Sequence, residues 1–99
     1  MTGMPPKQNV VEFTFQPAHR MSGEAVLAGV TALLEGQAKR RETHGTAALW
    51  YAWGLPCGLD IEVIRYVSGI TVIRLYRRGK ASHALGKKLQ RVFKAWWTM

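Results

Sequence analysis

The chain has 99 residues, of which 47% are hydrophobic and 10% aromatic, enough for one domain with a single modest core. No apolar run approaches the roughly 20 residues of a membrane-spanning helix, and the start, MTGMPPKQNV, lacks the apolar core of a secretory signal. The single cysteine, Cys57, excludes an internal disulfide framework, so we expect a protein of the reducing cytoplasm.

Charge is the unusual feature of this sequence. Fourteen Lys and Arg against six Asp and Glu give a formal net charge of +8. Such an excess attracts polyanions, which are nucleic acid first and an anionic membrane surface or an acidic protein next. From Arg74 onward there are eight cations and no acid, whereas the chain before Arg74 holds six of each. The positive field is therefore local, which is typical of a docking surface.

The first half of the chain predicts one strand and one long helix. Residues 1–8 contain two prolines and indicate a flexible lead-in. The stretch VVEFTFQ alternates apolar and polar side chains, which predicts a half-buried strand over residues 10–16. Ser22 then offers a helix N-cap, and apolar residues recur at helical spacing after it. We therefore expect a helix over residues 22–43, ended by Gly45.

Three further strands are predicted after that helix. The stretch TAALWYAW is apolar on both sides, which is typical of a strand inside a sheet and predicts a strand over residues 46–54. The segments LDIEVIRYV and ITVIRLYRR flank Ser68 and Gly69, a two-residue hairpin signal. They predict strands over residues 59–67 and 70–78.

The register of this hairpin decides which side chains share a face. If Val67 faces Ile70, then Arg65 and Arg74 become diagonal neighbours on one face. Neither face is cleanly apolar, so the sequence leaves open which one is buried. A second copy of the chain is one candidate for covering part of it, and a homodimer is therefore among the expected assemblies.

The last helix, predicted over residues 81–97, has two distinct sides on a helical wheel. Its apolar side, expected to pack on the sheet, holds Leu85, Leu89, Val92, Phe93 and Trp96. Its basic side holds Lys80, His83, Lys87, Arg91 and Lys94, with Lys88 near the boundary. Trp97 lies off the apolar edge, where it either caps the core or stacks on a base or partner.

The elements together predict one α+β domain over residues 1–99, with the order β-α-β-β-β-α. We expect a mainly antiparallel four-stranded sheet with two helices packed on one face.

The basic side of the last helix is the main functional signal. No acidic residue interleaves to form i,i+4 pairs, so the like charges repel. More cations precede the helix, at the end where the helix dipole is already positive. Binding to the phosphate backbone of a nucleic acid is the simplest way to offset this repulsion and the unfavourable interaction with the helix dipole. We therefore predict a nucleic-acid-binding surface that consists of Arg74, Arg77, Arg78, Lys80, His83, Lys87, Lys88, Arg91 and Lys94.

The sequence carries no signature of catalytic, metal or cofactor chemistry. The stretch RGKAS lacks the glycine and the Ser or Thr that a P-loop requires. The three histidines and one cysteine have no recognised zinc spacing. Asp60 and Glu62 share a strand face, but a lone Asp-x-Glu pair is a weak metal signal. We expect no metal and no cofactor.

The element order of this small basic domain resembles two known architectures. It is similar to bacterial toxins of the RelE/ParE kind, which implies metal-independent cleavage of messenger RNA by cations, Tyr or His. The corresponding candidates are Arg65, Arg74, Tyr76, Arg77 and His83. The order α-β-β-β-α with a basic start to the last helix also resembles a double-stranded-RNA-binding domain.

Three interpretations follow from the sequence. The first is a non-enzymatic nucleic-acid-binding module or accessory subunit of a nucleoprotein complex, for DNA or RNA. The second is a protein-interaction module, such as a small inhibitor, adaptor or dimerising subunit, whose basic face meets an acidic protein surface. The third is a toxin-like ribonuclease. None of the three involves a membrane.

Overall fold

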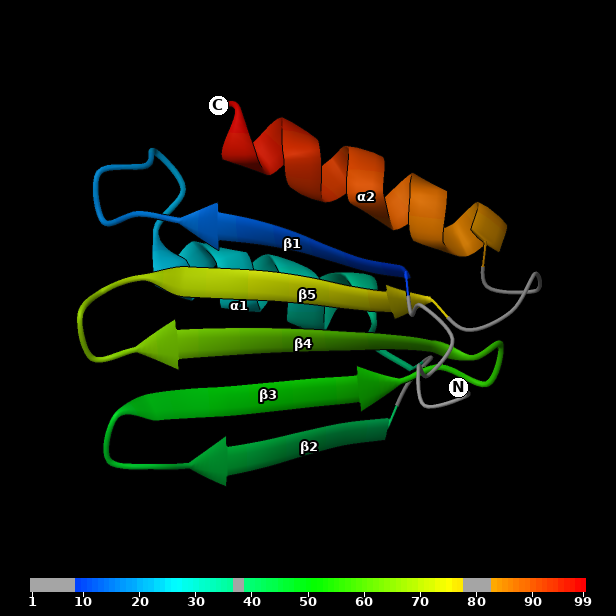
Figure 1. The fold of residues 1–99 in the computed structure, drawn as a ribbon, viewed down its shortest axis with the longest axis horizontal. Helices are drawn as coiled ribbons and strands as arrows, with labels where there is room; N and C mark the ends of the chain where they lie inside the picture. Colours follow the sequence, from blue (N-terminus) through cyan, green and yellow to red (C-terminus); the bar gives the residue numbers. More distant parts are fainter. Residues whose placement is uncertain (1–8, 37–38, 78–82) are drawn as a thin grey trace, which may run out of the picture.

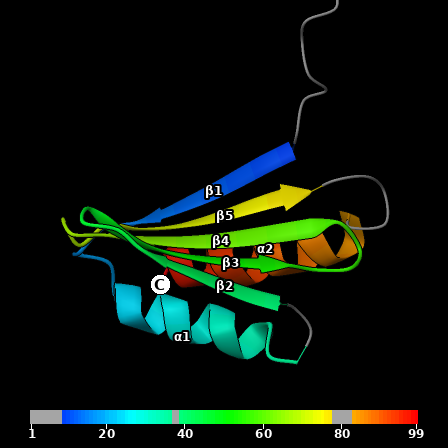
Figure 2. The ribbon, with the colours of Figure 1, turned by 90° about the horizontal axis from the view of Figure 1, so that it is seen from below.

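The computed structural model describes residues 9–36, 39–77 and 83–99. Five strands form one antiparallel sheet in the order β1-β5-β4-β3-β2, and both helices lie on the same face of it (Figures 1 and 2). The α+β class and the one-sided helix layer are thus confirmed, but the sheet has five strands rather than four. The elements are β1 (Asn9–Phe15), α1 (Gly23–Leu33), β2 (Lys39–His44), β3 (Ala48–Gly54), β4 (Leu59–Tyr66), β5 (Thr71–Arg77) and α2 (His83–Trp97).

The additional strand is β2, which occupies residues predicted to end the first helix. The helix begins as expected, with the Ser22 hydroxyl accepting a hydrogen bond from the Ala25 N–H, but it ends at Leu33. Gly36 follows with a φ of 73°, a left-handed conformation that ends helices and that glycine adopts without a steric cost. The segment KRRETH then pairs along its whole length with β3. Its helix-forming residues are overridden by this tertiary pairing.

The hairpin of β4 and β5 is confirmed, but its loop has three residues rather than two. The Tyr66 N–H donates to the Ile70 carbonyl, and the Gly69 N–H donates to the Tyr66 carbonyl. Gly69 has a φ of 93°, which fits the common three-residue loop with a left-handed last residue. Residues 67–69 therefore form the loop, and the two strands are offset by one residue from the predicted register.

This offset corrects the faces on which the hairpin side chains lie. Arg74 stands opposite Glu62, and Arg65 stands opposite Thr71. A one-residue slip moves every side chain of a strand to the other face. Arg65 and Arg74, predicted to be neighbours on one face, consequently lie on opposite faces of the sheet.

The core lies between the sheet and the two helices. Alternate residues of the central strands face the helices, and the two helices contribute their apolar sides. Leu33 is 42% exposed, because Leu34 takes the buried position at the end of α1. The buried cluster includes Phe15, Tyr51, Trp53, Leu59, Ile61, Val63, Ile73 and Leu75 of the sheet side, and Val26, Val30, Leu34, Leu89 and Phe93 of the helix side.

The two helices touch each other beneath the sheet. A methyl group added at Gly29 of α1 would lie 2.7 Å from the Trp96 ring of α2, so the absence of a side chain at Gly29 admits the indole. Trp96 also packs on Phe93, with ring centroids 5.3 Å apart.

The radius of gyration, 13.9 Å, is close to the roughly 13 Å of a folded domain of this size. In the described ranges, neither helix is long and apolar enough to cross a membrane.

Candidate functional site

The solvent side of α2 carries a continuous set of cations. The opposite side packs on β1 and β5, where Leu89 and Phe93 are buried. Because the cations follow one another at helical spacing, they share the outward side of the helix. The four cations Lys87, Lys88, Arg91 and Lys94 are all exposed, and we call them the α2 basic face. His83, also exposed, lies at the start of the same helix.

No carboxylate of the described residues balances the α2 basic face. The fifteen residues of α2 include no Asp or Glu. Among the described residues, none of its four cations forms an ion pair; the pairs that form there are Arg74 with Glu12 and His44 with Glu42. Lys87 and Arg91 are one helical turn apart, about 6 Å along the axis, so they repel. An anionic partner would relieve this repulsion.

Arg77 lies under α2 and does not point into solvent with the basic face. It stands on the helix-covered side of β5, and a methyl group added at Gly86 would lie 2.5 Å from its Cδ. The stem of Arg77 therefore packs against the helix, while its Nε is buried and has no hydrogen-bond partner among the described residues. Two further predicted site residues, Arg78 and Lys80, lie outside the described residues.

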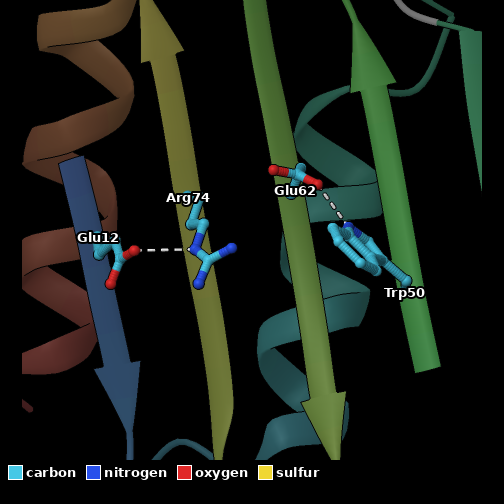
Figure 3. Close-up of polar contacts among 4 residues, drawn as sticks. All are labelled: Glu12, Trp50, Glu62 and Arg74. Atoms are coloured by element: carbon cyan, nitrogen blue, oxygen red, sulfur yellow. Dashed lines mark hydrogen bonds and ion pairs between the residues drawn. The ribbon is translucent and has the colours of Figure 1, made fainter. Parts of the chain in front are cut away.

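Arg74 does not belong to the α2 basic face, because it lies on the sheet face that neither α1 nor α2 covers. Figure 3 shows it with Glu12, Glu62 and Trp50, and with the helices behind the sheet. Its Nε donates to Glu12 Oε1 at 2.9 Å, and the Trp50 indole N–H donates to Glu62. Burial lowers the pKa of Arg74, but Tyr76 and the Glu12 carboxylate raise it by more, so the net change is upward. Arg74 is thus a partly neutralised member of a separate polar cluster.

Tyr76 completes this cluster on the uncovered face. Burial raises the pKa of its phenol, and a hydrogen bond and the charge of Glu62 raise the pKa further, against the opposing effect of Arg74. Three large apolar side chains of this face are exposed as well: Val10, Trp50 and Tyr66. The uncovered face therefore combines a paired polar cluster with exposed aromatic surface.

The residues suggested by the toxin-like resemblance do not form one site. Arg74 and Tyr76 lie on the uncovered face, whereas Arg65 and Arg77 lie on the face toward the helices. Arg65 sits beneath the start of α1, where a methyl group on Gly23 would lie 3.3 Å from its Nε. The sheet separates the two pairs of side chains. In the described part of the chain, no group of three His, Cys, Asp or Glu side chains could hold a metal ion.

A groove runs between the edge strand β1 and α2. It has a volume of about 560 Å³, and Lys94 of the α2 basic face is part of its wall. Trp97 also lines it: its indole N–H donates to the Thr14 carbonyl at 2.9 Å, and its ring lies against His19 with centroids 6.0 Å apart. Packing of Trp97 against the body of the protein was one of the two predicted roles.

The chain matches no family model, no curated protein and no solved structure.

Sequence reasoning identified the α2 basic face but missed the groove and the polar cluster. The helical cations are spaced three or four residues apart, so a wheel finds them. His19 and Trp97 are separated by most of the chain, and only the packing of α2 on β1 brings them together. The Arg74–Glu12 pair required the register of β1 on β5. Gly69 at the third loop position was the signal that could have corrected the hairpin register.

Proposed function

We propose that the chain is a nucleic-acid-binding module that contacts the phosphate backbone through the α2 basic face. One observation carries this proposal. Lys87, Lys88, Arg91 and Lys94 are exposed together on a helix without an acidic residue, and none of them is paired among the described residues. Uncompensated cations on one face are the electrostatic footprint of polyanion binding.

The length of the basic face fits a short stretch of phosphates. Lys87 and Lys94 are seven residues apart, which corresponds to about 10 Å along a helix. One strand of a B-form duplex carries a charge about every 3.4 Å of axis, so about three phosphates of one strand span the same distance. Contacts of this kind position a protein without reading sequence.

A double substitution tests the proposal. Replacing Lys87 and Arg91 by Gln leaves folding nearly intact, because both side chains are exposed opposite the buried side of α2. We expect weaker binding to any oligonucleotide. The slope of log K against log salt should become shallower by about 0.7–0.9 for each phosphate contact removed.

The matched control replaces Arg20 and Arg41 by Gln. Both are exposed and lie outside α2, so this variant loses the same net charge from other surfaces. Its salt slope should equal that of the wild type. An equal loss in both double variants would mean that net charge alone drives binding. A wild-type chain without salt-dependent affinity for any oligonucleotide would contradict the proposed function, and an acidic protein surface would become the better partner for this face.

A second candidate function is protein binding through the uncovered sheet face. Trp50 is 44% exposed there, close to the exposed Tyr66 of the neighbouring strand β4, and exposed aromatic surface is typical of interfaces. We would measure self-association by sedimentation velocity. A dimer that Trp50→Glu dissociates would support this candidate, and a wild-type monomer at every concentration would argue against self-association through this face.

A further inference from the structure

The groove between β1 and α2 has the composition of a nucleobase site. Its volume of about 560 Å³ lies within the range of small-ligand sites, roughly 300–1,000 Å³. Aromatic rings, side-chain amides and one cation line it together. The lining residues that matter here are Phe13, Thr14, His19, Gln90, Lys94 and Trp97.

Two of the aromatic rings are held in place before any ligand arrives. Trp97 is fixed through its indole N–H to the Thr14 carbonyl, yet 42% of its surface remains exposed. His19 is fixed through Nδ1, which accepts a hydrogen bond from the Gln16 N–H at 2.8 Å. A ring that is already oriented loses little conformational entropy when a base stacks on it.

The edge of β1 supplies hydrogen-bonding groups along the same groove. In an antiparallel pair, backbone groups point alternately toward the partner strand and away from it. The bond from Trp97 shows that the Thr14 carbonyl points away from β5. By the same alternation, the N–H and C=O of Glu12 point outward. The Glu12 carboxylate, also at this edge, is paired with Arg74, which offsets its repulsion of phosphate.

Lys94 connects the groove to the α2 basic face, since it belongs to both. A strand whose phosphates follow Arg91 and Lys94 would therefore bring a neighbouring base to Trp97. A base inside a duplex is stacked on both sides and cannot enter such a groove, whereas a base of a single strand can.

We propose that this groove binds one unpaired base of a single-stranded nucleic acid, with Trp97 as the stacking surface and Lys94 on the adjoining phosphate. This inference rests on the proposed function, because the phosphate contacts of the α2 basic face hold the strand beside the groove. It adds a preference for single strands that phosphate contacts alone do not give.

The test compares one mixed-sequence oligonucleotide as a single strand and as a duplex. Trp97→Leu should lower the affinity for the single strand by about 5- to 150-fold, the equivalent of roughly 1–3 kcal/mol per stacked base. Affinity for the duplex and the salt slope should stay at the wild-type values. Trp97→Phe, which keeps an aromatic ring, should retain most of the single-strand affinity. Gln90→Ala, which leaves Trp97 and all cations in place, should weaken only single-strand binding.

The outcomes separate this inference from the proposed function. One outcome is that the wild type binds the duplex with a normal salt slope, but Trp97→Leu affects both oligonucleotides equally or neither. This outcome would contradict base binding in the groove and would still support phosphate binding by the α2 basic face. No salt-dependent affinity of the wild type for either oligonucleotide would overturn both. Thermal unfolding of each variant shows whether α2 still docks. If Trp97→Leu does not fold, Trp97→Phe and Gln90→Ala provide the test. An affinity of Gln90→Ala that falls as much for the duplex as for the single strand would then contradict the inference.

Discussion

Tyr76 shows how its neighbours set the chemistry of one side chain. It lies on the uncovered sheet face, and the register of β4 on β5 places it in the row beside Glu62 and Arg74. Burial raises the pKa of its phenol, and the Glu62 carboxylate adds to the increase. The native fold therefore favours the neutral phenol more than the unfolded chain does.

This increase predicts a loss of stability at alkaline pH. The folded-state pKa of Tyr76 lies above the unfolded value, which is about 10 for Tyr. This difference contributes to the free energy of unfolding, and the contribution is complete below about pH 10. The contribution is lost as the pH rises through the folded-state pKa. Denaturant unfolding at a series of pH values should show a steeper alkaline decline for the wild type than for Tyr76→Phe. Superimposable profiles of the two proteins would show that Tyr76 has no such linkage.

At the scale of the element, α2 is held by its apolar side and exposes its basic side. Leu89 and Phe93 are buried in the core, and Phe93 also meets the Phe13 ring of β1 with centroids 6.3 Å apart. The basic face contributes no ion pair among the described residues, so packing on the sheet is what fixes the helix. The apolar side of α2 thus contributes stability, and the basic side contributes charge.

Two substitutions on α2 test this separation. Leu89→Ala removes a buried side chain and should lower the free energy of unfolding by about 2–5 kcal/mol. Lys88→Ala, on the exposed side of the same helix, should change it by no more than about 0.5 kcal/mol. Urea denaturation of the purified variants gives both values. A loss below about 1 kcal/mol for Leu89→Ala would mean that the helix does not pack on the sheet as described.

At the scale of the whole molecule, the sheet separates two chemically different surfaces. The helix layer carries the α2 basic face, and the opposite side carries the cluster of Arg74, Glu12 and Glu62 with Trp50 (Figure 3). Arg74 was predicted to bind nucleic acid together with the helix cations. Its position on the other side of the sheet, paired with Glu12, removes it from that surface.

Arg74→Gln therefore distinguishes the two surfaces. We expect nucleic-acid affinity and salt slope to match the wild type, because Arg74 contacts Glu12 and Tyr76 on the far face. The substitution of Lys87 and Arg91 should weaken binding in the same titration. A loss of affinity in Arg74→Gln as large as in that double variant would mean that nucleic acid also contacts the uncovered face.

Short-range patterns in the sequence were enough to predict much of the fold and half of the candidate site. Alternation predicted β1, a hairpin signal predicted the pairing of β4 with β5, and helical spacing predicted both sides of α2. The excess of cations after Arg74 and their spacing on one helix predicted the basic face. These features depend on residues within a few positions of one another, so the sequence by itself determines them.

The tertiary structure alone decided the fifth strand and the groove, and it also corrected the hairpin register. Residues 39–42 are good helix formers in isolation, and residues 39–44 become β2 because the edge of β3 offers hydrogen-bonding partners along their length. The three-residue loop before Ile70 shifted the register by one position and sent Arg65 and Arg74 to opposite faces. His19 and Trp97 meet only because α2 docks against β1. The pairing of β2 with β3 and the docking of α2 on β1 have a free energy that exists only once the sheet has assembled, whereas the hairpin register follows from the conformation of its loop.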